Sequence, residues 1–456
     1  MKLIIDFEKI TALKGAPPAK KGEVLSILKD AGRAKGLGLE ESNLLLSIED
    51  KGLLQALYKK AGEVKERLFG KRVVLFAPLY LSNYCTNSCV YCGFRGPNRD
   101  VQRKALSMEE VVSEARRLES MGFKRVLLVT GEDPRWGVDY IVSAIKVVYE
   151  NTGMRIVHLN APPMDKESFR EIKKAGAGVY QAFQETYHRD TYKAMHPSGR
   201  KSGFDLRLSV MDRAVGAGFR DVGIGPLLGL YDYRFDCLCT IAHSKHLYGE
   251  FGAHAHTISV PRLRPAAGSG LKEIPAPVTE TELKKIVAVF RLAVPTAGVV
   301  VSTREPAGLR SALVHSGASQ MSAASRTDPG GYAVNTKQKP SLEQFSTNDH
   351  RSLAEVMKSI IDEGFVPSLC TTCYRVGRTG AEFTDKTASG SMEKFCSANA
   401  ALTLKEFLTD YSKNGMKGSI EKAIKLSLKE IKDPVMRKAV QERLKEIEDG
   451  GRDIFF

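Results

Sequence analysis

Hydrophobic and polar positions change their period along the chain, and the changes predict alternating strands and helices. Short apolar runs such as KRVLLVTG at 124–131 and RIVHLNAP at 155–162 are typical of buried strands. Amphipathic segments at 107–122, 139–153 and 279–295 have apolar residues at helical spacing. About eight such units predict a parallel sheet closed as a (β/α)8 TIM-type barrel. A doubly wound open sheet is the alternative, but no phosphate-binding glycine fingerprint follows the first strand, RVVLFAPLYLS.

The segments on either side of the predicted barrel have a different pattern. Residues 1–70 are expected to be mostly helical, and Gly70 ends the last predicted helix. A polar stretch at 335–349 is expected to be irregular, and a helix follows it at 350–364. Near the C-terminus, Asp433 and Pro434 are expected to cap a second of two amphipathic helices. The expected divisions are an N-terminal helical segment 1–70, a barrel 71–335 and a C-terminal region 336–456.

Charge and hydropathy exclude some classes of partner. The net charge is +15, from 68 Lys and Arg against 53 Asp and Glu. The basic residues are spread out, and no basic patch with interleaved aromatic residues indicates a nucleic-acid partner. No apolar run approaches the ~18 residues of a membrane span. The first ten residues, MKLIIDFEKI, carry acids within their apolar stretch, which is unlike a signal peptide. We expect a cytoplasmic protein.

Six of the eight cysteines fall into two tight groups of three. The first group is C-x3-C-x2-C and the second is C-x2-C-x22-C. Their members are Cys85, Cys89 and Cys92, and Cys370, Cys373 and Cys396. Thiolates are the ligands of iron–sulfur clusters, and three of them leave one iron of a 4Fe-4S cluster open. The alternative is structural zinc, which prefers four ligands, and no fourth Cys or His lies near the first group.

The first group lies just after the first predicted strand and resembles the signature of the radical S-adenosylmethionine (radical SAM) superfamily. In that superfamily the open iron binds the amino and carboxylate groups of S-adenosyl-L-methionine. The resemblance implies that Tyr91, between the last two cysteines, contacts the adenine. It also implies that Gly131, Glu132 and Asp133 hold the methionine amino group. These positions follow predicted strands, where barrel active sites are built.

From about residue 70 to 411 the chain resembles the HydG family, the tyrosine lyases that mature FeFe-hydrogenase. The resemblance is carried by segments such as NYCTNSCVYCGF, GEDP, FQETYH, DVGIGPLLGLYDY, HTISVPRLRPA, STRE and CTTCYRVGRTG. Its most specific part is the second cysteine group, since the related ThiH family of iminoacetate synthases shares the barrel but lacks that cluster. The implied fold is a radical SAM barrel with an N-terminal helical segment and a C-terminal helical iron–sulfur cluster domain.

The resemblance also implies the chemistry, the cofactors and the partners. A 5′-deoxyadenosyl radical takes a hydrogen from L-tyrosine, and the Cα–Cβ bond breaks to give p-cresol and dehydroglycine. The fragment becomes CO and cyanide on an extra iron beside a second 4Fe-4S cluster. Reduced ferredoxin or flavodoxin would supply electrons, and a scaffold protein of hydrogenase maturation would accept the product. No nucleic acid or membrane is expected as a partner.

Further residues match the family by motif. His256 in HTISVPR corresponds to the histidine that binds the extra iron, and His254 is the alternative. Glu185 in FQETYH resembles the acid that faces the cofactor ribose. Arg304 in STRE is a candidate clamp for the amino-acid carboxylate, or else a surface ion pair. Ser322 and Arg326 in SAASRT are weaker candidates for the site. Two further cysteines, Cys237 and Cys239, match no ligand of the family and are expected to be buried small residues.

Three departures from the family pattern border the barrel mouth. Asn160-Ala161-Pro162-Pro163 stands where the family has an alanine-rich strand end, Thr130 precedes the Gly-Glu-Asp motif in place of alanine, and Ala324 replaces a usual glycine. The alternatives are therefore an iminoacetate synthase or a lyase of another aromatic amino acid. A radical SAM enzyme that modifies RNA or protein, and a non-catalytic metal-binding scaffold, are hypotheses from other classes.

Overall fold

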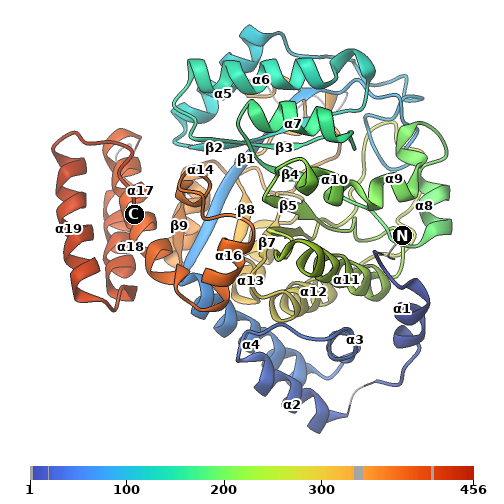
Figure 1. Ribbon diagram of the computed structural model, residues 1–456, viewed down its shortest axis with the longest axis horizontal. Coiled ribbons are helices and arrows are strands. Elements are labelled where there is room, and N and C mark those ends of the chain that lie inside the picture. The colour runs from blue at the N-terminus through green and yellow to red at the C-terminus, as the bar shows by residue number, and fades with distance from the viewer. Residues whose placement is uncertain (1–3, 19, 333–341, 412–414) are drawn as a thin grey trace.

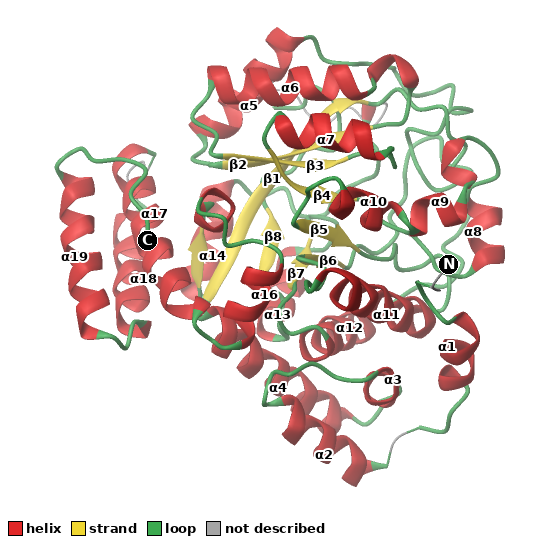
Figure 2. Ribbon diagram, viewed as in Figure 1, coloured by secondary structure: helices red, strands yellow, loops and turns green. Residues whose placement is uncertain are grey.

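The central feature of the computed structural model is a closed parallel barrel, confirming the predicted fold class (Figures 1 and 2). The structure describes residues 4–18, 20–332, 342–411 and 415–456, so part of the polar stretch at 335–349 lies outside the described residues. Strand β1 pairs with both β8 and β2, which closes the sheet. The strands are β1 (Arg72–Ser82), β2 (Arg125–Thr130), β3 (Ile156–Asn160), β4 (Ala177–Gln181), β5 (Asp221–Ile224), β6 (Thr257–Ser259), β7 (Gly298–Val301) and β8 (Gln320–Ser322).

Helices surround the barrel, as Figure 2 shows. They are α5 (Met108–Ser120), α6 (Val138–Asn151), α7 (Lys166–Lys174), α8 (Arg189–Met195), α9 (Phe204–Leu208), α10 (Val210–Gly216), α11 (Tyr233–Phe251), α12 (Glu280–Ala293) and α13 (Ala307–His315), with short 3₁₀ turns η1 (Pro134–Trp136) and η2 (Arg200–Ser202). Between β4 and β5 the chain does not form one continuous helix, because it breaks into α9 and α10 at Ser209. The Ser209 hydroxyl donates to the Asp205 carbonyl at 2.7 Å, a local bond that competes with helical continuation.

The N-terminal segment is helical, as predicted. It forms α1 (Phe7–Lys14), α2 (Lys21–Ala31), α3 (Leu39–Leu46) and α4 (Lys51–Phe69), which lie on the side of the barrel covered by α11, α12 and α13 (Figure 1). Helix α4 has its buried leucines at helical spacing, including Leu53, Leu57 and Leu68. Among the described helices, none combines the length and the apolar character that crossing a membrane requires.

A ninth strand, β9 (Val366–Ser368), is not predicted by the sequence pattern. It pairs in parallel with the first residues of β1, with Arg72 opposite Val366 and Val74 opposite Ser368. Strand β9 follows α14 (Leu353–Asp362) and leads directly to Cys370. The remaining helices are α15 (Thr372–Arg375), α16 (Ala381–Ala388), α17 (Met392–Asp410), α18 (Lys417–Glu430) and α19 (Pro434–Glu448), and Asp433 caps α19 as predicted. Helices α17, α18 and α19 form a group at one side of the barrel (Figure 1).

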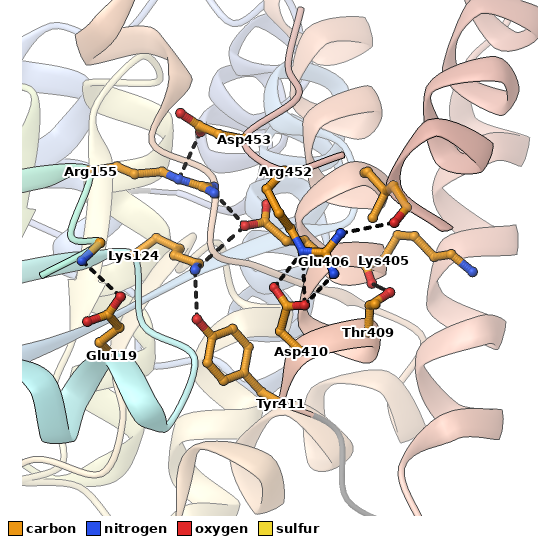
Figure 3. A network of polar contacts seen from close by, with 12 residues as sticks. Glu119, Lys124, Arg155, Lys405, Glu406, Thr409, Asp410, Tyr411, Arg452 and Asp453 are labelled. Carbon is orange, nitrogen blue, oxygen red and sulfur yellow. Dashed lines mark hydrogen bonds and ion pairs between the residues drawn. The ribbon is translucent and has the colours of Figure 1, made fainter. Parts of the chain in front are cut away.

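A buried ionic network fastens this helical group to the barrel (Figure 3). Glu406 of α17 is 3% exposed and bonds Arg155, which precedes β3. Its Oε1 also lies 3.6 Å from Nζ of Lys124, which precedes β2. Lys124 donates to the Tyr411 hydroxyl at 2.8 Å, and Asp453 lies 2.8 Å from Nε of Arg155. Two barrel strands are therefore tied at their amino ends to the helix that carries Cys396.

Removing the Glu406 carboxylate should destabilise the protein strongly. Glu406→Ala leaves two buried cations without their shared anion, and breaking a buried pair in this way costs about 3–5 kcal/mol. Chemical denaturation measures the free energy of unfolding. The control is Glu448→Ala, which removes the exposed partner of Lys405 and should change little. Equal small effects of the two substitutions would contradict a docking role for Glu406.

Ala324 adopts the left-handed conformation, with φ of +51°. This explains why the family usually has glycine at this position, since left-handed backbone costs a residue with a Cβ roughly 1–2 kcal/mol. Ala324→Gly should therefore raise the melting temperature, against a small entropic cost from the unfolded state. Ala323→Gly is the matched control, because Ala323 is fully buried, is not left-handed and should lose stability. A lower melting temperature for Ala324→Gly would contradict the proposal that the left-handed backbone at Ala324 is strained.

Candidate functional site

The first cysteine group opens into a cavity of about 220 Å³ at the carboxyl ends of the strands. The loop after β1 brings Cys85, Cys89 and Cys92 to its wall, and Gly131 and Glu132 follow β2 on the same wall. Gly131 has no substitute here, since a Cβ would lie 2.2 Å from the Tyr84 carbonyl oxygen. The backbone of the cysteine loop thus packs directly against the turn that follows β2.

The three thiols line one cavity, with Cys89 buried and Cys85 and Cys92 partly buried. Burial raises the pKa of the Cys92 thiol to about 12, and the charges of Cys89 and Cys85 add to the effect. Amide groups of Asn87 and Gln344 lie 3.6 Å from Sγ of Cys85 and 3.8 Å from Sγ of Cys92. Within the described residues, no group of three His, Cys, Asp or Glu side chains is arranged to hold a single metal ion. Three thiols that line one cavity suit the wider, cationic core of an iron–sulfur cluster, whose charge would stabilise the thiolates.

Two of the three residues of the Gly-Glu-Asp turn, Gly131 and Glu132, line the cavity. Glu132 accepts from the Asn87 side-chain amide at 2.7 Å, and the Glu132 carbonyl accepts from the Thr86 N–H at 2.8 Å. Asp133 points elsewhere: it caps η1 and pairs with Arg135 at 2.8 Å, and this partner lowers its pKa. Asp133 therefore shapes the turn from outside the cavity, while Gly131 and Glu132 line it.

Glu185, after β4, lines the same cavity in a strained conformation with φ of +71°. Its Oε1 accepts from Lys201 Nζ at 2.6 Å and lies 3.8 Å from an Arg207 nitrogen. Burial alone would raise the pKa of this carboxyl, but the charges of Lys201 and Arg207 outweigh burial and lower it. Glu185 is thus held ionised. The sequence pattern predicts neither cation, because Lys201 lies in the 3₁₀ turn η2 and Arg207 in the short helix α9, and neither segment carries a motif of its own.

Arg304 and Ser322 lie on the opposite wall, at the ends of β7 and β8. The Arg304 guanidinium lies 3.3 Å from the centroid of the Phe345 ring, and burial lowers its pKa to about 10. No carboxylate is paired with Arg304 among the described residues, so a surface ion pair, the alternative from sequence, does not describe it. Ser322 accepts from the Thr303 N–H at 3.2 Å. Arg326 does not line the cavity.

Tyr91 is not part of the cavity wall, although sequence reasoning placed it against an adenine. Its ring packs with Cys89 and Leu227, and its hydroxyl lies 2.8 Å from Nε2 of His196. Leu227 lines the cavity in its place. Cys237 and Cys239 of α11 are at most 1% exposed, which confirms that they are buried small residues.

The second cysteine group lines a separate, smaller cavity at the opposite end of the barrel. Cys370 follows β9, Cys373 is in α15 and Cys396 is in α17. His256, which immediately precedes β6, lines this cavity and is 7% exposed. His254 lies in another cavity, where its ring stacks on Tyr248 with centroids 4.5 Å apart. Geometry therefore groups His256, and not His254, with the cysteines.

Two arginines that sequence reasoning missed also line the second cavity. Arg72 opens β1 and Arg125 opens β2. The Nε atoms of both are buried and have no hydrogen-bond partner within the described part of the chain. Burial raises the pKa of the Cys373 thiol to about 12, with Cys396 adding to the effect and Arg72 opposing it. A second three-thiol set with cationic neighbours fits an anionic, cysteine-bound cluster.

A parallel (β/α)8 barrel with a three-cysteine loop after its first strand defines a radical SAM enzyme. Residues 79–235 match the Radical SAM superfamily model, and residues 259–366 match the Biotin and Thiamin Synthesis associated domain. Such a domain implies a 4Fe-4S cluster and S-adenosylmethionine.

The comparisons with whole proteins narrow this class. The chain is similar to a structure described as HydG, a maturase of the FeFe-hydrogenase (44% identity, TM-score 0.96, 99% of this chain and 100% of that one). It is also similar to the HydG maturase from Carboxydothermus hydrogenoformans (37%, TM-score 0.82, 96% of each chain). The 2-iminoacetate synthase of Escherichia coli K12 is 34% identical over 76% of this chain and 90% of that one. The chain belongs to the radical SAM family of HydG maturases and 2-iminoacetate synthases.

Replacing Lys201 should change how the free energy of unfolding depends on pH, because Lys201 keeps Glu185 ionised. In the native protein the Glu185 pKa is lowered, so this ion pair contributes stability above the unfolded pKa and loses it as pH falls through the folded pKa. Lys201→Met removes the nearest cation and raises the Glu185 pKa. The variant should be destabilised at pH 7, and its deficit should shrink towards pH 5 as Glu185 takes up a proton. Urea unfolding measures this, with exposed Lys193→Met as control. A deficit independent of pH would contradict the coupling.

Proposed function

We propose that this chain is a radical SAM lyase that cleaves the Cα–Cβ bond of L-tyrosine to p-cresol and dehydroglycine, and that it converts the fragment to CO and cyanide for FeFe-hydrogenase maturation. The observation that carries the proposal is the pair of three-cysteine cavities at opposite ends of one barrel. One cavity suits radical generation and the other suits a separate metal-bound step. Similarity to HydG structures over nearly the whole chain supports both halves.

In the first cavity we assign Cys85, Cys89 and Cys92 to the 4Fe-4S cluster. When bound there, S-adenosylmethionine supplies a 5′-deoxyadenosyl radical. The backbone at Gly131 and the Glu132 side chain are suited to the methionine ammonium, with Asp133 holding the turn. Glu185 is kept ionised by Lys201 and is suited to accept hydrogen bonds from ribose hydroxyls. Tyr91 would act from behind the wall, by supporting Cys89 and Leu227.

Arg304 is the group that we assign to the substrate carboxylate. It is partly buried and charged, it has no acidic partner among the described residues, and its planar fork suits bidentate pairing with a carboxylate. Ser322 lies on the same wall and offers a hydroxyl. Phe76, Phe94 and Phe345 supply aromatic surface in this cavity, and Tyr80 and Gln344 supply a hydrogen-bonded polar pair at 2.8 Å. The ring of an aromatic amino acid could pack on the phenylalanine side chains, and its phenol hydroxyl could hydrogen-bond to the polar pair.

In the second cavity we assign Cys370, Cys373 and Cys396 to the auxiliary 4Fe-4S cluster, and His256 to an extra iron. Imidazole is a normal ligand of iron. Arg72 and Arg125 would balance the negative charge of the thiolates and of an anion such as cyanide. A reduced ferredoxin or flavodoxin would supply electrons, and a maturation scaffold protein would take up the product.

A second candidate function is 2-iminoacetate synthesis, because the E. coli enzyme of that name matches most of this chain. It would use the same first cavity and the same cleavage of tyrosine. The two functions differ in what happens to the fragment, and hence in the need for the second cysteine group.

The decisive assay uses protein reconstituted anaerobically with iron and sulfide, then given S-adenosylmethionine, dithionite and L-tyrosine. We expect p-cresol, measured by chromatography, and CO, trapped by a haem protein. Cys396→Ala should abolish CO and keep p-cresol, because the first cavity is intact. Cys237→Ala is the matched control, a buried cysteine in α11 outside both cavities, and it should keep both products.

The other outcomes separate the hypotheses. Formation of p-cresol without CO by the unmodified protein would favour 2-iminoacetate synthesis. Formation of 5′-deoxyadenosine without p-cresol would retain radical chemistry and refute tyrosine as substrate.

A further inference from the structure

A buried carboxylate stands directly behind His256. Asp221 is the first residue of β5 and is 2% exposed. Its Oδ1 lies 3.3 Å from Nδ1 of His256, which immediately precedes the neighbouring strand β6. The His256 N–H donates to the Val222 carbonyl at 2.8 Å, so the two strand ends are fixed in register. Asp221 does not line either cysteine cavity and has no role in the proposed function as stated above.

The other nitrogen of His256 faces a different group. Nε2 lies 2.9 Å from the hydroxyl of Tyr374, the residue that follows Cys373, and both side chains line the cysteine cavity. A carboxylate on the Nδ1 side favours the tautomer with its proton on Nδ1. The lone pair of the neutral ring then lies on Nε2, where the Tyr374 hydroxyl can donate to it. The imidazole thus has its basic nitrogen on the side of Tyr374, in the wall of the cavity that the three cysteines line.

Asp221 also contacts the loop that carries the second cysteine group. The Gly380 N–H donates to Asp221 Oδ1 at 2.9 Å. Gly380 has φ of +61°, and a Cβ there would come within 3.2 Å of Arg220, so the backbone at this point is closely packed on the barrel. The second oxygen, Oδ2, is buried and has no hydrogen-bond partner in the described part of the chain. One carboxylate therefore contacts both the histidine and the cysteine-bearing loop.

We propose that Asp221 is a positioning residue that holds His256 with Nε2 directed at the cysteine cavity, and that it thereby raises the affinity of this end of the barrel for a ferrous ion. The proposal deepens the proposed function, because it rests on His256 as a ligand. Carboxylates behind metal-binding histidines fix the ring and increase its basicity, and their loss typically lowers metal affinity by roughly 10- to 100-fold. The geometry here has the same three parts: carboxylate, imidazole and an accessible nitrogen.

The test is direct Fe²⁺ binding to the reconstituted protein, with no substrate present. Protein holding both clusters is treated with a mild chelator and titrated anaerobically with ferrous ammonium sulfate. Bound iron is measured by equilibrium dialysis, and nitrogen hyperfine coupling by pulsed electron paramagnetic resonance. Asp221→Asn is the informative variant, because the amide oxygen can still accept from the Gly380 N–H beside Nδ1 of His256 while the charge is lost. We expect Fe²⁺ affinity to fall roughly 10- to 100-fold with the melting temperature and cluster content unchanged.

Three further variants make the result specific. Asp212→Asn alters another carboxylate–imidazole pair, with His246 at 3.0 Å, away from both cysteine cavities, and should leave Fe²⁺ binding unchanged. His256→Gln should abolish the high-affinity site and the nitrogen coupling. Tyr374→Phe removes the hydroxyl that lies 2.9 Å from Nε2, a group that would compete with Fe²⁺ for this nitrogen, and should tighten Fe²⁺ binding a few-fold.

Each contrary result has a distinct meaning. Unchanged affinity in Asp221→Asn, with the site lost in His256→Gln, would overturn the role of Asp221 and leave the proposed function intact. Unchanged affinity in His256→Gln would overturn both this inference and the assignment of His256. If Asp221→Asn failed to hold the cysteine-bound cluster, the Tyr374→Phe variant would serve as the test instead. Fe²⁺ binding to Tyr374→Phe that is equal to or weaker than binding to the unmodified protein would overturn the proposed orientation of Nε2.

Discussion

The arrangement of both cysteine groups depends on one long strand. Strand β1 has eleven residues and so spans the barrel, roughly 3.3 Å per residue. Its last residue, Ser82, is three residues before Cys85, and its first residues pair with β9, which ends two residues before Cys370. The hydrogen bonds of this strand therefore fix the first group at the carboxyl end and the second at the amino end. A break in β1 would move both groups at once.

Electrostatics then distinguishes the two ends. In the first cavity, Lys201 and Arg207 are matched by the buried carboxylate of Glu185, which keeps the acid ionised. In the second cavity, Arg72 and Arg125 have no carboxylate partner among the described residues, and the three cysteine side chains interact electrostatically with Arg72. Around Glu185 the first end therefore suits a ligand that needs acceptors, such as a ribose or an ammonium, whereas the second end suits groups that carry negative charge.

Much of the fold could be predicted from the sequence because its signals are local. Apolar runs and helical periodicity identify the eight units, and the spacing of Cys85, Cys89 and Cys92 identifies the first site. Strand β9 could not be found this way, since it is only Val-Pro-Ser and exists because the distant start of β1 offers it hydrogen bonds. Asp221 and Lys201 could not be found either, because each gains its meaning only from a partner on another strand or loop.

The two candidate histidines illustrate the same limit. His254 and His256 are two residues apart, a spacing that puts both side chains on one face if the strand continues through them. Strand β6 begins only at Thr257, however, so the strand rule does not apply. His254 turns to stack on Tyr248, and His256 turns inward between Asp221 and Tyr374. Only the fold separates them.

The barrel interior brings the two cavities close together. On β1, Val74 lines the second cavity and Phe76 the first; on β7 the same holds for Gly298 and Val300. On β8, Gln320 lines the second cavity and Ser322 the first. On each of these three strands, residues two positions apart therefore line different cavities, a separation of about 7 Å along the strand. Under the proposed function, a reactive two-carbon fragment formed in the first cavity would cross this layer of barrel side chains on its way to the second cysteine group. The closed sheet would keep it from bulk water on the way, which is the advantage of placing two reaction centres at opposite ends of one barrel.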